Sequence, residues 1–498
     1  MSLPYPQALL SVRSRYYPLR QLIVKAKRRE KKRVIAPGIT IEKMAAEGKC
    51  IGHLEDGRVV FVPYSAPGDV ADLLITRSKH SHAEGLIDRL ITPSDRRREP
   101  VCPHFGLCGG CKWQHVPYAM QLQAKEQQVY DQLTRIGKVT IGEQRPILGC
   151  ERELGYRNKL EFTFSSSRWI TEEERALLNG EVVNERRGVG FHIPGRFDKV
   201  LDIRECYLMD DLNNKIRNFI RHYCLTHEGY TFFDLRQQVG QMRTMMLRIS
   251  STGEVMLVIA FGEEDEERRT ALLSALREAF PEITSLLYAI NTKGNDTLDG
   301  LEVKTFAGRD YIVEELEGLH FKVGPKSFFQ TNSRQAYRLY SVVRELAHLT
   351  GKEMVYDLYT GTGTIASFVS RQAAHVIGIE YVEEAIRDAR LNADFNGLTN
   401  LDFYAGDMKD ILTDDFVTSH GRPDVIIADP PRAGMHPDVL QTILYARPDR
   451  IVYVSCNPAS QARDLQTLQE EYAVAVTQPV DMFPQTHHVE NVVLLVRK

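Results

Sequence analysis

From about residue 330 to the C-terminus the chain repeats one pattern: a short apolar run, a polar loop and a helical stretch. Strands that alternate with helices predict an α/β fold with a doubly wound, parallel sheet. Ligands of such sheets bind beyond the carboxyl ends of the strands, so chemistry is expected in the loops that follow them. The predicted strands are residues 354–358, 376–380, 401–404, 424–428, 451–455 and 489–496.

A glycine loop, Asp357 to Thr364, follows the first of these strands and opens a helix. Its Gly-x-Gly lets the backbone turn tightly and approach a ligand closely. The third glycine of the dinucleotide fingerprint is missing, and no Gly-Lys-Ser/Thr of a phosphate loop follows. Glu380 ends the next strand, where an acid suits a ribose diol. The loop therefore favours S-adenosylmethionine over a dinucleotide, and the alternative is a plain strand-to-helix turn.

Two later strands end in rigid polar segments, Asp429 to Arg432 and Ser455 to Pro458. Prolines stiffen both segments, and Asn457-Pro458 directs the chain out of the sheet, which would expose Cys456. If the two strands are neighbours, Asp429 and Cys456 face one cleft. Cys456 is thus a candidate nucleophile, although a thiol of ordinary pKa needs activation at neutral pH. The alternative is an inert, buried cysteine.

Glu490 begins a strongly apolar strand that runs to the C-terminus. A carboxylate in such surroundings is costly unless it is solvated or paired. Desolvation raises the pKa of a carboxylate, which suits a general base near neutral pH. A solvated strand end is the alternative.

Cys102, Cys108 and Cys111 place three thiols within ten residues. Three thiolates suit an iron–sulfur cluster or zinc in a reducing compartment, and a fourth ligand must come from elsewhere. Spacing alone leaves that ligand and the metal open. The candidates for the fourth ligand are Cys206, Cys150 and Cys224.

The rest of the chain divides by composition and pattern. Residues 1–36 hold ten Lys/Arg and one acid, although the whole chain has a net charge of −3. Residues 1–38 are thus predicted to be a flexible basic tail, with an organelle transit peptide as the alternative. Alternating strands after it predict a small OB-type β-barrel. A helix over 118–136 and a mixed α+β region follow. No apolar run nears the length of a membrane span, and a monomer in the cytoplasm is expected.

Taken together, these motifs resemble the RNA 5-methyluridine (uracil-C5) methyltransferases. The resemblance is to the branch that carries an N-terminal TRAM domain and a [4Fe-4S] cluster and modifies 23S rRNA, and it covers nearly the whole chain from residue 39. Thr360, where the family often has cysteine, and Ala433, where lysine is frequent, depart from its pattern. The motifs that carry the resemblance are Pro100 to His115, Phe328 to Asn332, Asp357 to Gly363, Asp429 to Arg432, Ser455 to Pro458 and His488 to Glu490.

The resemblance implies three domains: a TRAM barrel at 39–98, a central α+β domain with the cluster at 99–326, and a Rossmann-like catalytic domain at 327–498. It also implies that 118–149 packs on the catalytic domain. Cys456 would be the nucleophile and Glu490 the base. The cluster would be held by Cys102, Cys108, Cys111 and Cys206. S-adenosylmethionine would be contacted by Gln330, Tyr359, Gly361, Thr364, Glu380, Asp407 and Asp429.

The implied function is S-adenosylmethionine-dependent methylation of a uridine in 23S rRNA, through a covalent bond between Cys456 and C6 of uracil. Such an enzyme binds RNA and has to unstack its target base. Two alternatives stay open at this point. One is a tRNA 5-methyluridine methyltransferase of the same chemistry. The other is a non-catalytic RNA-binding ribosome assembly factor that has kept the fold.

Overall fold

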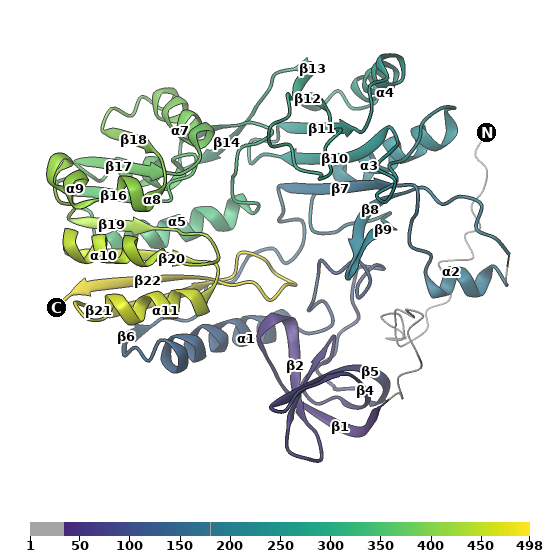
Figure 1. The fold of residues 1–498 in the computed structure, drawn as a ribbon, viewed down its shortest axis with the longest axis horizontal. Coiled ribbons are helices and arrows are strands. Elements are labelled where there is room, and N and C mark those ends of the chain that lie inside the picture. Colours follow the sequence, from purple (N-terminus) through teal and green to yellow (C-terminus); the bar gives the residue numbers. More distant parts are fainter. Residues whose placement is uncertain (1–33, 180) are drawn as a thin grey trace. The chain divides into compact units, whose positions relative to one another are not determined.

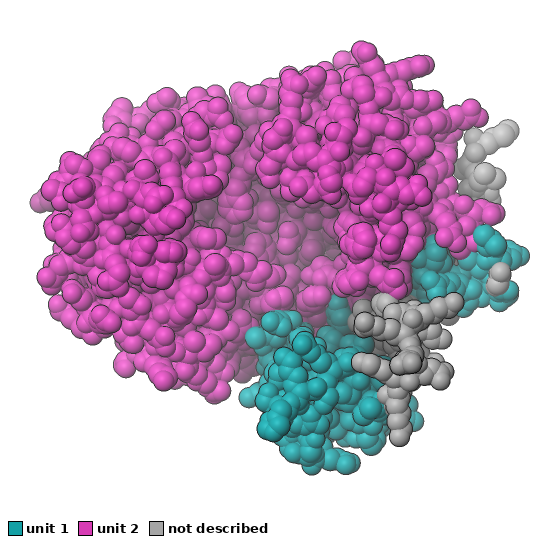
Figure 2. All heavy atoms as spheres, in the orientation of Figure 1, with its two compact units in different colours: residues 1–99, 170–182 teal, residues 100–169, 183–498 magenta. Residues whose placement is uncertain are grey.

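A computed structural model describes residues 34–179 and 181–498. The basic tail predicted over 1–38 lies almost wholly outside the described residues. The described chain forms two compact units, coloured separately in Figure 2. The smaller holds the residues up to 99 together with 170–182, and the larger holds 100–169 and 183–498.

The smaller unit contains a closed five-stranded barrel, which confirms the predicted OB-type architecture. Side chains alternate along its strands, so Val60 and Val62 are fully buried while Val59 and Phe61 are partly exposed. A short helix, α2 (Glu172–Leu177), also belongs to this unit, and Thr171 caps it. The barrel strands, in the order β1-β2-β3-β5-β4, are β1 (Ile35–Met44), β2 (Lys49–His53), β3 (Val59–Pro63), β5 (His82–Thr92) and β4 (Val70–Ser78).

The larger unit begins with the cysteine-rich segment and the helix α1 (Tyr118–Asp131), which ends in a π-helical turn at Gln132–Ile136. The helix predicted over 118–136 is therefore confirmed. A strand that follows it, β6 (Ile141–Gln144), joins the far edge of the C-terminal sheet. The chain thus adds a strand to the C-terminal sheet before it forms the middle region of this unit.

That middle region is a seven-stranded mixed sheet with two helices, α3 (Leu212–Thr226) and α4 (Glu266–Ala279). A two-stranded hairpin, β14 (Ile312–Leu316) and β15 (Leu319–Val323), then leads to the C-terminal sheet (Figure 1). The sheet order is β13 (Lys304–Gly308), β12 (Ile283–Ile290), β11 (Val255–Phe261), β10 (Met242–Ile249), β7 (Lys159–Ser165), β8 (Gly188–Ile193) and β9 (Arg196–Asp202).

The C-terminal sheet has eight strands and helices on both faces (Figure 1). Alternate residues of β16 (Met354–Leu358) face the two layers of helices. Val355 packs in the hydrophobic cluster on one face of the sheet, and Tyr356 packs in the cluster on the other face. The sheet order is β18 (Leu401–Ala405), β17 (His375–Glu380), β16 (Met354–Leu358), β19 (Val425–Ala428), β20 (Arg450–Ser455), β22 (Glu490–Arg497), β21 (Tyr472–Val480) and β6. The helices are α5 (Ser333–Ala347), α6 (Thr364–Ser370), α7 (Glu383–Phe395), α8 (Met408–Ile411), α9 (Asp414–His420), α10 (Pro437–Ala446) and α11 (Pro458–Leu468).

All six predicted strands of this sheet are present, but the sheet is not wholly parallel. β22 pairs with β20 and β21 in the antiparallel sense, because β21 and β22 are consecutive strands with no crossover helix between them. The sequence analysis did not predict β21 or the contribution of β6. Reversing β22 brings its first residue, rather than its last, to the carboxyl ends of the parallel strands.

Candidate active site

The register of β20 and β22 sets Cys456 beside Glu490. Ser455, the last residue of β20, lies opposite Asn491 in that antiparallel pair. Cys456, which follows β20, therefore adjoins Glu490, the first residue of β22. Glu490 is 7% exposed and Cys456 is half-buried. The structure thus brings together the two residues that the sequence indicated as nucleophile and base.

The loop after β19 is tied to the turn that carries Cys456. The side-chain amide of Asn457 donates to the carbonyl of Arg432 (2.9 Å), and the hydroxyl of Ser460 donates to the same oxygen (3.0 Å). Asn457 also caps α11, with Pro458 in its first turn. These bonds fix Cys456 at a rigid junction and hold the loop from Asp429 against it.

The charges around Cys456 are mainly negative. Burial, with a smaller contribution from the carboxylate of Asp429, raises the pKa of Glu490 to about 8 against the opposing effect of Arg432. Burial likewise raises the pKa of the Cys456 thiol to about 11, with contributions from Glu490 and Asp429 that Arg432 opposes. Burial also raises the pKa of Asp429 to about 7. Arg432 is therefore the cation that favours the charged forms of both Cys456 and Glu490.

The glycine loop after β16 is held from below by Asp357. One carboxylate oxygen of Asp357 accepts from the Thr360 hydroxyl and from the Ala366 backbone N–H (3.0 Å), and the other is buried without a partner. Gly363 has a φ of 74°, and a Cβ on it would lie 2.9 Å from the Cβ of Ala389. Only glycine fits there, so the loop can turn into α6 while packing closely on α7.

The same loop faces open space at Gly361. A Cβ on Gly361 would meet no atom within 4 Å, whereas its N–H donates to the carboxylate of Glu380 (3.1 Å). The backbone N–H of Val382 holds the other oxygen of Glu380 (3.0 Å). Tyr359 takes a left-handed backbone conformation, with a φ of 64°. A fixed carboxylate beside an unobstructed glycine loop suits a ligand that carries a ribose.

The remaining predicted residues lie around this loop. Gln330 is half-buried, and its carbonyl accepts from the side chain of Asn158 (2.9 Å). The neighbouring Phe328 is 71% exposed. Thr364 begins α6 and is buried, and Asp407 caps α8 after β18. Each of these positions is at or near the edge formed by the carboxyl ends of β16, β17 and β18.

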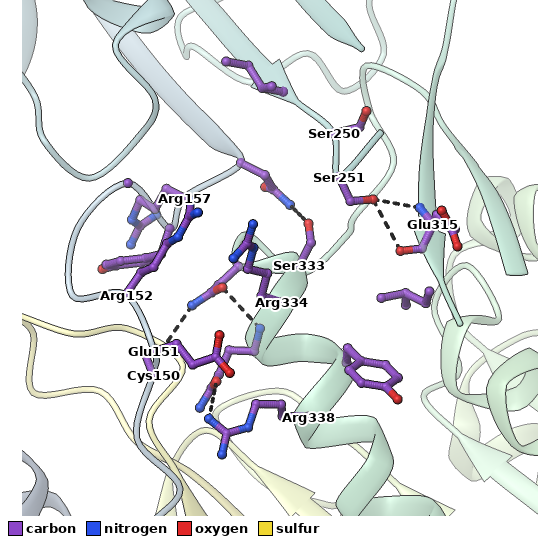
Figure 3. A pocket seen from close by; sticks show the side chains of 18 of the residues that line it. Cys150, Glu151, Arg152, Arg157, Ser250, Ser251, Glu315, Ser333, Arg334 and Arg338 are labelled. Atoms are coloured by element: carbon purple, nitrogen blue, oxygen red, sulfur yellow. Dashed lines mark hydrogen bonds between the residues drawn. The ribbon is translucent and has the colours of Figure 1, made fainter. Parts of the chain in front are cut away.

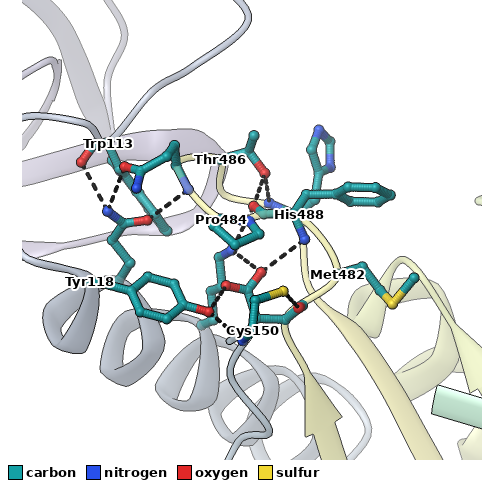
Figure 4. Close-up of polar contacts among 12 residues, drawn as sticks. Trp113, Tyr118, Cys150, Met482, Pro484, Thr486 and His488 are labelled. Carbon is teal, nitrogen blue, oxygen red and sulfur yellow. Dashed lines mark hydrogen bonds and ion pairs between the residues drawn. The ribbon is translucent and has the colours of Figure 1, made fainter. Parts of the chain in front are cut away.

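The loop that precedes Glu490 is anchored by a buried ion pair. Lys125 Nζ and Asp481 Oδ1 are 2.6 Å apart, and both side chains are fully buried. Tyr118 donates its hydroxyl to the other oxygen of Asp481 (2.8 Å), as Figure 4 shows from the side of α1. Removing one partner of such a pair would leave a buried charge without compensation, so the pair ties α1 firmly to this loop.

A second set of bonds joins the loop to the cysteine-rich segment. The backbone N–H groups of Lys112 and Trp113 both donate to the carbonyl of Gln485 (2.8 and 3.1 Å). The side chain of Gln121 accepts from the Gln485 N–H (2.9 Å). The residues next to Cys111 therefore brace the segment that leads directly to Glu490.

The four predicted cluster cysteines lie near one another, although Cys206 is distant in sequence from the other three. Burial is the main cause that raises the pKa of Cys102 to about 12, and the neighbouring Cys108 and Cys206 contribute to that rise. The pKa of Cys111 is raised in the same way by burial and by Cys108, Cys102 and Cys206. The Sγ atom of Cys111 also accepts a hydrogen bond from the side chain of Gln114 (3.2 Å). Within residues 34–179 and 181–498, no three or more His, Cys, Asp or Glu side chains are arranged to hold a metal ion.

Two residues that shape the site were not selected from the sequence. Arg432 lies in a motif that was interpreted through its aspartate and prolines alone. Asp357 lies near the end of an apolar strand. The signal for Arg432 was available, since it is the cation nearest to Asp429 in sequence. The anchoring pair Lys125 and Asp481 had no local signal, because the two residues are 356 positions apart.

Comparisons with known proteins agree with this geometry. The family model described as tRNA (uracil-5-)-methyltransferase matches residues 300–498, and the TRAM domain model matches residues 38–87. An uncharacterized RNA methyltransferase of Porphyromonas gingivalis is 59% identical over 461 residues, which are 92% of this chain and 99% of that protein. One of Bacteroides thetaiotaomicron is 58% identical over 455 residues, 91% of this chain and 99% of its own length.

A solved structure agrees as well. The crystal structure of Pyrococcus abyssi tRNA (uracil-54, C5)-methyltransferase in complex with S-adenosyl-L-homocysteine matches with a TM-score of 0.70 and 26% sequence identity. The match covers 92% of this chain and 99% of that chain.

No helix in the described residues has both the length and the apolar character of a membrane span. The chain therefore belongs to the family of RNA (uracil-5-)-methyltransferases.

Proposed function

We propose that this RNA methyltransferase transfers a methyl group from S-adenosylmethionine to C5 of a uridine in 23S rRNA, through a covalent bond between Cys456 and C6 of uracil. The observation that carries the proposal is the β20–β22 register, which sets the Cys456 thiol beside the Glu490 carboxylate. The TRAM match and the four grouped cysteines support ribosomal RNA, because the sequence resembles the branch that has both.

The chemistry follows from the weak nucleophilicity of C5 in uracil. The Cys456 thiolate adds to C6, and the electron pair of the C5–C6 bond moves onto C5 and O4. S-adenosylmethionine, when bound, supplies the electrophilic methyl group that C5 takes up, and S-adenosylhomocysteine is the leaving group. Glu490 then removes the proton from C5, the C5–C6 double bond re-forms, and the Cys456 thiolate leaves.

The residues around the glycine loop fit the methyl donor. The carboxylate of Glu380 is fixed by two backbone donors beside the open face of Gly361, which suits a ribose diol. Gln330, Tyr359, Thr364, Asp407 and Asp429 are proposed as further contacts. Asp429 would also lie between donor and uracil, because its strand adjoins that of Cys456.

The four cysteines fit a cluster better than one ion. A single zinc ion needs sulfurs within about 2.3 Å of one point, whereas a four-iron cluster binds one thiolate per iron and spreads its ligands. The four thiols are close enough to interact electrostatically, as the ligands of one cluster would be. Cys102, Cys108, Cys111 and Cys206 would hold the cluster, which would stabilise the segment that braces Gln485.

Replacing one of these cysteines should therefore release iron. We expect Cys206→Ala, purified anaerobically, to lose most of its iron and acid-labile sulfide, measured by colorimetric analysis and visible absorption. Cys224→Ala, which removes a buried thiol from α3, should keep both. Equal iron content in the two variants would contradict the proposed ligand set.

Arg432 should set the pH dependence of the reaction. Cys456 and Glu490 must both lose protons, and burial raises their pKa values to about 11 and about 8, so kcat/KM should rise steeply with pH up to about pH 8 and less steeply from there to about pH 11. Arg432 lowers both values, so Arg432→Gln should move the rising limb about one unit toward higher pH. Arg387→Gln, on the exposed side of α7, serves as the control. An unmoved limb in Arg432→Gln would refute this role.

A tRNA substrate is the second candidate, because the solved relative that covers 92% of this chain is a tRNA methyltransferase. The test uses 23S rRNA and tRNA from a strain that lacks this gene, each incubated with the enzyme and radiolabelled S-adenosylmethionine. Nucleoside analysis should show label in 5-methyluridine of 23S rRNA. Label confined to tRNA would establish the alternative, and label in neither RNA would remove both.

A further inference from the structure

A cavity of about 690 Å³ opens in the larger unit apart from the candidate active site. Its wall is formed by residues 150–158, the turn after β10, the β14–β15 hairpin and the first turns of α5 (Figure 3). Neither Cys456 nor Glu490 lines it. Its volume is in the range of pockets that bind small ligands or single nucleotides.

Four arginines line this cavity, and they come from two segments that are far apart in sequence: Arg152, Arg157, Arg334 and Arg338. Figure 3 shows them gathered along one side of it. Arg338 donates to the carbonyl of Gly149 (2.5 Å), which orients it. Arg157 lies over the ring of Phe483, and its buried Nε has no hydrogen-bond partner.

The other two arginines are free to meet a ligand. Arg152 and Arg334 are exposed, and neither forms an ion pair with any described residue. Glu151 is exposed beside Arg152, and the whole lining holds four arginines and four acids. Guanidinium groups present paired donors that match the oxygens of a phosphate.

The remaining acids of the cavity already have partners. Glu317 pairs with Arg344 (2.9 Å), and the carboxylate of Asp210 accepts from the backbone of Leu212 (3.0 Å). Glu315 lies across the cavity near Ser251, and its carboxylate accepts from the N–H of Gly318 (3.3 Å). Of these three acids only Glu317 is neutralised by a cation, whereas Asp210 and Glu315 keep their negative charges within the lining.

The cavity also offers an aromatic ring and a helix N-terminus. Tyr337, 39% exposed, lines the cavity one turn along α5 from Ser333. The 15-residue helix α5 begins at Ser333, so its positive end faces the same space. Arginines with an exposed aromatic ring are the combination by which proteins hold single-stranded nucleic acid.

The cavity is joined directly to the segment that carries Gln330. The Asn158 side chain, which lines the cavity, donates to the carbonyl of Gln330 (2.9 Å), and its backbone N–H donates to the carbonyl of Thr331 (2.8 Å). Asn158 is therefore shared between the wall of the cavity and the segment that carries Gln330.

We propose that this cavity binds a single-stranded RNA segment next to the target uridine, with phosphates on Arg152, Arg157 and Arg334 and a base on Tyr337. The proposal rests on the proposed function for its RNA substrate. It assigns the site a role in holding unpaired flanking nucleotides while the target base is out of its stack.

The test is fluorescence anisotropy of a short fluorescein-labelled oligouridylate with the double variant Arg152→Gln/Arg334→Gln. Both side chains are exposed, so the variant should keep its fold, which circular dichroism checks. We expect at least a tenfold loss of affinity, and a salt slope shallower by roughly 1.4, at about 0.7 per lost phosphate contact on a single strand. The matched control, Arg277→Gln/Lys352→Gln, removes two exposed charges outside the cavity.

A further variant, Tyr337→Leu, should weaken binding about tenfold without changing the salt slope, since stacking carries no charge. Affinity equal to that of the control in the arginine variant would overturn the proposal, as would tight binding of free UMP with unchanged RNA affinity. Because no methyl transfer is measured, the assay is independent of the proposed function. Wild-type protein that binds RNA through this cavity but methylates neither RNA would refute the proposed function alone.

Discussion

Cys456→Ala should abolish methyl transfer. Without a thiolate to add to C6, uracil C5 stays a poor nucleophile, so the rate should fall by at least about 10⁴-fold. The measurement is transfer of label from S-adenosylmethionine to unmodified RNA under single-turnover conditions. Binding of RNA should change little, since one half-buried thiol contributes little surface.

Cys224→Ala is the matched control, because it removes a thiol buried in α3 rather than at the strand ends. It should keep nearly full activity once its fold is confirmed. Substantial methylation by Cys456→Ala would show that Cys456 does not form the bond to C6, and the covalent mechanism would then have to be abandoned.

Glu490→Gln should trap the enzyme on its product. The amide cannot take the proton from C5, so the methylated ring cannot expel Cys456, and RNA should stay covalently attached. We expect turnover to fall by about 10²- to 10⁴-fold while a complex that resists SDS accumulates. Gel electrophoresis of labelled RNA with the variant detects that complex.

The exposed Glu278→Gln, at the end of α4, controls for the loss of one carboxylate. It should turn over normally and leave no complex. If Glu490→Gln also turned over normally, another group must take the C5 proton. If it lost turnover without any complex, Glu490 would act before the methyl group arrives.

The sequence predicted the strand ends of the site because each is marked by its own local signal. Cys456 follows an apolar strand and precedes a proline, and Asp429 stands before two prolines. Local signals do not show whether a strand runs parallel or antiparallel to its neighbours in the sheet. A parallel β22 would have carried Glu490 to the opposite edge of the sheet, so the contact with Cys456 depends on an antiparallel pairing that the repeat pattern alone did not predict.

Features built from distant residues could not be found in the same way. The buried pair Lys125 and Asp481 reads in sequence as two ordinary surface charges, and only the packing of α1 against the loop before Glu490 buries them. The arginines of the cavity likewise lie in two segments, around Arg152 and Arg334. Neither segment is notably basic, so their charge becomes concentrated only when the chain folds.

The barrel was predictable because its strands alternate strictly and are separated by turn residues. The domain limits and the location in the cytoplasm stay predictions. The basic tail is predicted over residues 1–38, of which the described structure does not include residues 1–33. Its contribution to RNA binding can be measured by comparing the salt slope of the full chain with that of a chain that begins at Val34.

The most direct test of the central claim uses RNA in which uridine is replaced by 5-fluorouridine. Fluorine at C5 cannot leave as a proton does, so the step assigned to Glu490 is blocked in the wild-type enzyme. With S-adenosylmethionine present, the account predicts an SDS-resistant complex whose RNA-bearing peptide contains Cys456, and none with Cys456→Ala. No complex with the wild-type protein on an RNA that it methylates, or attachment at another residue, would contradict it.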